Sequence, residues 1–153
     1  MNVRTILSSG ILAAASMALV ACGGEQKPAV DTTTAAAPAA PATAPNVPQT
    51  PGPGGKIITV YTITDDKGNY FSPAEITAKQ GDVIRYTLKI GVHNVHFLPD
   101  SNAGKTGYPT LPSEMLQLPG QTYDVLVNFA PGVYYFQCDP HAALGMKGHL
   151  TVK

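Results

Sequence analysis

The chain has 153 residues, with ten acidic and ten basic side chains and a formal net charge of zero. This balance argues against nucleic-acid binding and against strong steering of a charged partner, because both depend on an excess of one charge. Residues 56–153 keep eight side chains of each sign, and their length suits one domain with a modest hydrophobic core.

The N-terminal residues have the layout of a secretory signal. Arg4 precedes an apolar run from Ile6 to Ala21, which is too short for a comfortable transmembrane helix. Residues 19–22, LVAC, resemble a bacterial lipobox, and this resemblance implies cleavage after residue 21 and lipidation of Cys22. A plain signal peptide and an uncleaved anchor are the alternatives.

A lipidated Cys22 places the protein in the bacterial cell envelope, on the extracytoplasmic side. Gly23 follows that cysteine, rather than the aspartate that retains many lipoproteins at the inner membrane. We therefore expect the periplasmic face of the outer membrane where a cell has two membranes. Residues 22–55 are rich in Ala, Pro and Thr, a composition that predicts a disordered linker to the domain at 56–153.

The domain is predicted to consist of β-strands. In residues 83–90, Ile84, Tyr86, Leu88 and Ile90 alternate with polar residues, which is typical of a strand with one buried face. The other candidates are 57–63, 75–79, 93–98, 122–129, 133–138 and 148–153, and residues 112–117 are compatible with one helical turn. Seven or eight short strands predict an all-β Greek-key sandwich.

The segment CDPHAALGM, residues 138–146, carries the clearest chemical signal. It places Cys138, His141 and Met146 in a short loop between two predicted strands. If Cys22 is lipidated, Cys138 has no intramolecular disulfide partner, so its thiol is either buried and inert, a ligand or a reactive group. A thiolate, imidazoles and a thioether form the ligand set of a blue-copper site, which needs one more histidine.

Two histidines in GVHNVHF are candidates for that position. Alternation along the chain places His93, Val95 and Phe97 on one face and His96 on the other. Phe97 is typical of a core residue, so His93 is favoured over His96.

The same segments carry a family resemblance. FSPAEITAKQGDVIRYTL, HNVHF, LPGQTYDVLV and YYFQCDPHAALGMKGHLTV resemble a plastocyanin-like cupredoxin, a type 1 blue copper protein. The resemblance implies one copper ion, held by His93, Cys138, His141 and Met146. It further implies that Asn94 braces the cysteine loop beside Asp139, which stands where the family usually has serine. Gln137 replaces the tyrosine that gives plastocyanins a second electron route.

The implied activity is one-electron transfer without enzymatic turnover. Electrons are expected to pass at the ring of His141, within an apolar rim of Ala142, Ala143 and Leu144. The implied partners are redox proteins, such as cytochromes or membrane oxidoreductase complexes, that dock transiently on a monomer. The alternative is a copper carrier or chaperone without electron transfer. A multicopper enzyme is disfavoured, because the domain has only four histidines and one cysteine.

Overall fold

The computed structural model describes residues 42–153. The predicted signal segment at 1–21, the lipidation site Cys22 and the linker as far as residue 41 lie outside this range. Within it, no helix is both long enough and apolar enough to cross a membrane.

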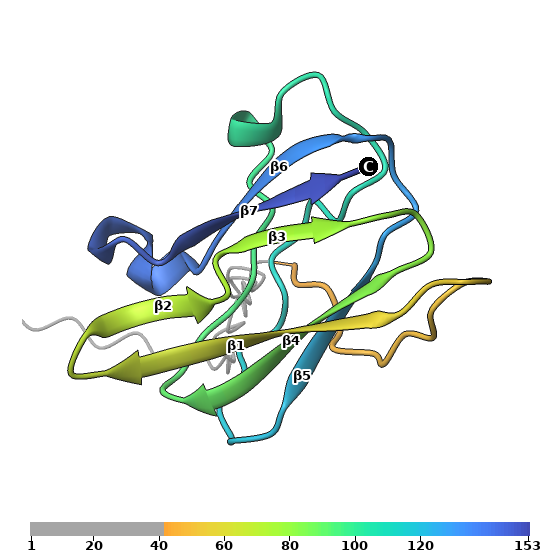
Figure 1. Ribbon diagram of the computed structural model, residues 1–153. Coiled ribbons are helices and arrows are strands. Elements are labelled where there is room, and N and C mark those ends of the chain that lie inside the picture. The colour runs from red at the N-terminus through yellow and green to blue at the C-terminus, as the bar shows by residue number, and fades with distance from the viewer. Residues whose placement is uncertain (1–41) are drawn as a thin grey trace, which may run out of the picture. The chain divides into compact units, whose positions relative to one another are not determined.

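Two mixed β-sheets build the domain, and this confirms the predicted all-β sandwich (Figure 1). The first sheet has the order β2-β1-β4-β5, with strands Gly68–Ser72, Ile57–Asp65, Val83–Ile90 and Thr122–Leu126. The second has the order β3-β7-β6, with strands Glu75–Ala78, Lys147–Val152 and Gly132–Gln137. Two short 3₁₀ helices, η1 (Asp100–Asn102) and η2 (Asp139–Leu144), complete the elements. In Figure 1, η2 lies at the end of the sandwich where β1 and β4 finish.

Aromatic rings fill the space between the sheets. Phe136 of β6 lies 4.9 Å from Phe71 and 5.4 Å from Tyr86, centroid to centroid, and both pairs meet edge to face. Such contacts add to the apolar burial of rings that are almost fully enclosed. Ile84, Tyr86 and Leu88 are buried as the alternation predicts. Ile90 is 54% exposed, because it lies at the end of β4, beyond a shift in the β1–β4 register.

Three local predictions differ from the structure. Strand β2 was not expected, since Gly68 and Asn69 at its start are typical turn residues. Residues 93–98 make two isolated bridges, at His93 and His96, instead of a continuous strand. The turn of helix with which residues 112–117 are compatible does not form, and Leu116 instead pairs with His93.

The N-terminal strap, residues 42–55, contacts the sandwich ahead of residue 56, where the sequence predicts the domain to start. Its Ala44 donates to the carbonyl of Pro112 at 2.7 Å, and Gln49 donates its backbone N–H to the carboxylate of Asp124 at 2.9 Å. These contacts order a segment whose composition predicted disorder, because its backbone groups find partners on the sandwich. The strap is therefore packed against the domain through its backbone.

Candidate metal centre

Three side chains from two loops meet at one end of the sandwich. The Sγ of Cys138 lies 3.4 Å from Nδ1 of His141 and 3.7 Å from Nδ1 of His93, and the two Nδ1 atoms are 3.2 Å apart. Cys138 and His93 are fully buried, while His141 is partly exposed. One sulfur and two nitrogen donors, all within 4.8 Å of one another, are close enough to share a metal ion.

The loop after β6 places two of these donors. The backbone of Cys138 accepts from His141 at 3.0 Å, and Cys138 donates to the carbonyl of Met146 at 3.1 Å. Met146 in turn donates to the carbonyl of His141 at 3.1 Å. Gly145 closes helix η2 with a φ of 94°, a conformation that favours glycine. This short loop holds the three residues together by its own backbone, and Met146 is fully buried within it.

His93 reaches the cluster from the other loop. Its backbone forms a two-way bridge with Leu116, with bonds of 3.1 Å and 2.7 Å, just beyond the end of β4. Burial lowers the pKa of His93, and the nearby His141 acts in the same direction. A neutral imidazole is the form that offers a lone pair to a metal.

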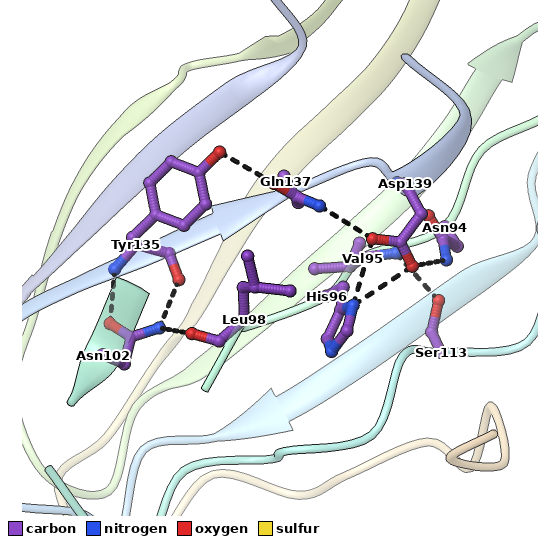
Figure 2. Close-up of polar contacts among 9 residues, drawn as sticks. All are labelled: Asn94, Val95, His96, Leu98, Asn102, Ser113, Tyr135, Gln137 and Asp139. Atoms are coloured by element: carbon purple, nitrogen blue, oxygen red, sulfur yellow. Dashed lines mark hydrogen bonds and ion pairs between the residues drawn. The ribbon is translucent and has the colours of Figure 1, made fainter. Parts of the chain in front are cut away.

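His96 stands outside the cluster of donors. Its Nδ1 faces the carboxylate of Asp139, at 3.0 Å and 3.1 Å from the two oxygens. Figure 2 shows this carboxylate between His96, Gln137 and Asn94. The Asn94 side chain donates to Asp139 at 2.9 Å and accepts from its backbone N–H at 2.8 Å. Asn94 and Asp139 therefore join the two loops that supply the donors, and His96 adds a further contact.

Asp139 stays ionised within this group of side chains. Burial acts to raise its pKa, but hydrogen bonds from Gln137, Asn94 and His96 outweigh burial and hold the pKa below its usual value. The contact made by His96 was not anticipated from the sequence, because His96 and Asp139 are 43 residues apart along the chain and meet only after the two loops pack together.

The thiol of Cys138, unlike the carboxyl group of Asp139, has a raised pKa. Burial raises its pKa, although hydrogen bonds from the backbone of Asn94 and His141 counter part of this effect. Without a cation nearby the group is a neutral thiol, and binding a metal must displace its proton. A free buried cysteine beside two imidazoles is a donor set that suits copper.

The outer side of the cluster is apolar. Ala143 and Leu144 follow His141 and are exposed, and Leu144 is 69% accessible. Ala142 is partly buried. Other exposed apolar side chains lie on the neighbouring segments, namely Ile90, Val92 and Leu118.

The sequence and the fold are both similar to those of known proteins. Plastocyanin A/B of Petroselinum crispum is 39% identical over 95 residues, which are 58% of this chain and 93% of that protein. Plastocyanin of Prochlorothrix hollandica is 34% identical over 92 residues, covering 59% and 68% of the two chains. Among solved structures, a mutant fern plastocyanin matches with a TM-score of 0.51 and 29% identity, over 63% of this chain and all of that one. A mutant amicyanin in its reduced form gives a TM-score of 0.50 and 28% identity, over 63% and 82% of the two chains.

Residues 58–153 match the family described as copper binding proteins of the plastocyanin/azurin type, which is well over half of the sequence. The match spans both loops that supply the donor atoms. The chain therefore belongs to the plastocyanin/azurin family of copper binding proteins.

Proposed function

We propose that the protein is a one-electron carrier that holds a single copper ion between His93, Cys138, His141 and Met146. The observation that carries this proposal is the convergence of Cys138 Sγ with the Nδ1 atoms of His93 and His141. When bound, copper supplies the one-electron chemistry by alternating between Cu(II) and Cu(I). The fern plastocyanin with a similar fold has been solved in oxidised and reduced forms.

The residues of the protein hold the donors in place. Asn94 and Asp139 tie the loop of Cys138 to the loop of His93, and Leu116 fixes the backbone of His93. Because these contacts form within the folded protein, the donor atoms need not be gathered when the ion binds. A rigid ligand set also keeps rearrangement small when an electron arrives or leaves.

We infer that electrons enter and leave at His141. It is the exposed member of the donor cluster, and Ala142, Ala143 and Leu144 continue from it along the surface. A small apolar contact suits transient docking, because a redox partner must dissociate quickly after exchange. Cytochromes and membrane oxidoreductase complexes are partners of the required kind, each giving or taking one electron.

The proposed location is the extracytoplasmic side of the cell envelope, with Cys22 as the lipid anchor. The lipobox-like residues 19–22 and the apolar run before them support it. A lipid anchor would confine the protein to a surface layer and raise its effective concentration near membrane partners.

Spectroscopy of the copper-loaded protein tests the function. We expect an intense blue thiolate-to-copper absorption band, a matching Cu(II) EPR signal, and reversible bleaching by a reductant. A colourless site that accepts only Cu(I) would support the alternative, a copper carrier without electron transfer.

A pair of histidine variants tests the ligand assignment. His93→Ala should abolish the blue band, because it removes a donor from the cluster. His96→Ala is the matched control and should keep the band, since His96 contacts Asp139 instead of Cys138. The reverse result would assign the ligand to His96.

A further inference from the structure

The Nε2 side of the His93 ring, which faces away from Cys138, has hydrogen-bonding partners of its own. Nδ1 of the ring faces Cys138, whereas Nε2 lies 3.1 Å from Oγ1 of Thr64 and 3.2 Å from the carbonyl oxygen of Ile90. Thr64 belongs to β1, a strand that carries none of the four proposed copper ligands. The first sheet thus contacts the donor cluster through Thr64, which is 29 residues from His93 in the sequence.

The direction of these hydrogen bonds follows from the neighbouring asparagine. Oγ1 of Thr64 lies 2.6 Å from Oδ1 of Asn69, its direct cross-strand partner on β2. An amide oxygen only accepts, so the single hydroxyl hydrogen of Thr64 goes to Asn69. Toward His93, Thr64 can then only accept, as can the carbonyl of Ile90. Nε2 must therefore carry the ring hydrogen, and Nδ1 keeps a free lone pair.

A glycine makes this approach possible. Gly91 has a φ of 101°, and a Cβ added to it would lie 2.5 Å from Oγ1 of Thr64 and 2.7 Å from Nε2 of His93. Both distances are shorter than real contacts allow. The register shift between β1 and β4, at Thr62 and Ile63, comes just before this point and brings Ile63 opposite Ile90.

We propose that Thr64 is a positioning residue for His93, which fixes the ring tautomer and orientation through an acceptor held in place by Asn69. The inference rests on the proposed role of His93 as a copper ligand. In metal sites the outer hydrogen bond of a ligating histidine sets its tautomer and raises its basicity. Thr64 performs this task here together with the carbonyl of Ile90.

Three variants separate the hydroxyl of Thr64 from packing. Thr64→Val keeps the shape and removes the acceptor, and Thr64→Ser keeps the acceptor. The matched control is Thr62→Val, two residues earlier on β1, where the buried hydroxyl has no hydrogen-bond partner in the structure.

The first measurement uses the metal-free full-length protein. Proton–nitrogen NMR of the imidazole should show a slowly exchanging hydrogen on Nε2 of His93 in the wild type, in Thr64→Ser and in Thr62→Val. In Thr64→Val we expect this hydrogen to exchange faster, because one of its two acceptors is missing. This measurement is independent of copper.

The second measurement is Cu(II) affinity by competition with a chelator. Thr64→Val should bind about tenfold more weakly, the lower end of the usual effect of removing an outer partner of a metal-bound histidine. Its reduction potential should rise, because a less basic imidazole favours Cu(II) less. Thr64→Ser should keep both the Cu(II) affinity and the reduction potential close to those of the wild type.

A Thr64→Val protein that matches Thr62→Val in either measurement overturns the proposal. Failure of the proposed function has a different signature. In that case His93→Ala would leave Cu(II) affinity unchanged, while the NMR measurement on metal-free protein would still test the positioning role of Thr64.

Discussion

Asn94 and Asp139 are joined by two hydrogen bonds in opposite directions. The side chain of Asn94 donates to the carboxylate of Asp139 at 2.9 Å and accepts from its backbone N–H at 2.8 Å (Figure 2). The two residues follow His93 and Cys138 directly in the sequence. Through this pair, each loop of the metal centre fixes the position of the other.

Removal of the Asn94 side chain should therefore destabilise the metal-free protein. We expect Asn94→Ala to lower the free energy of unfolding by about 1–3 kcal/mol, because a partly buried carboxylate and a backbone N–H each lose a partner. Urea denaturation measures the change. Asn128→Ala, at an exposed asparagine, is the control and should stay close to the wild type. Equal effects of the two substitutions would contradict the role of the pair.

A methyl group at Gly91 should damage the metal centre more than the fold. Gly91→Ala places a Cβ against Thr64 and the His93 ring, so we expect the Cu(II) affinity to fall steeply. Gly120→Ala is the matched control, because Gly120 also has a positive φ, of 88°, but nothing lies within 4 Å of the added atom. That variant should show only the backbone cost of about 1–2 kcal/mol in unfolding. Copper titration of both proteins makes the comparison, and equal affinities would refute the prediction.

A charge on the apolar surface beside His141 should slow electron exchange with partners. Leu144 is 69% exposed, so Leu144→Asp is expected to leave the blue absorption band and the stability nearly unchanged. Stopped-flow kinetics with a small cytochrome should show a slower bimolecular rate, because docking would bury the new carboxylate. Val133→Asp is the control, at an exposed valine on β6. If the two variants react at the same rate, docking occurs elsewhere.

Asp82 should make the stability depend on pH in the acid range. It is buried and accepts from the backbone N–H groups of Lys56 and Lys79 at 2.9 Å and 3.0 Å. Burial acts to raise its pKa, yet these bonds and the lysine charges hold the pKa below the ordinary value of 3.8. The carboxylate therefore contributes stability above that value, and the contribution is lost as the pH falls through the lower pKa of the folded state.

Asp82→Asn is the variant that reveals this contribution. It should be less stable than the wild type near neutral pH, and the difference should shrink as the pH falls below 3.8 and through the lower pKa of the folded wild-type carboxylate. Urea denaturation of the metal-free proteins across this range gives the two curves. Parallel curves would show that Asp82 is not the group responsible.

Much of the architecture could be predicted because it follows from local patterns. Alternation identified the buried face of β4, and the inward position of His93 followed from that of Phe97. The spacing of Cys138, His141 and Met146 indicated one loop, and the structure places all three there.

Contacts between remote segments could not be predicted in this way. Thr64 is 29 residues from His93, and it reaches the ring only because the β1–β4 register shift and Gly91 bring the two together. The strap was missed for a related reason. Its prolines and alanines predict little burial of their own, and its order comes from acceptors on the sandwich, such as Asp124.

The strap also affects whether two copies of the protein can associate through an open sheet edge. Strand β5 is the last strand on one side of its sheet among the described residues, and strap residues lie beside it, with Val47 and Gln49 lining one groove together with Tyr123 and Val125. An open sheet edge invites strand addition and aggregation, and proline is poorly suited to continue a sheet. The strap lies along this edge. Because it has prolines at 45, 48, 51 and 53, it does not itself present a regular strand edge to another chain. Order in these residues thus leaves the β5 edge less available for strand addition by another copy of the protein.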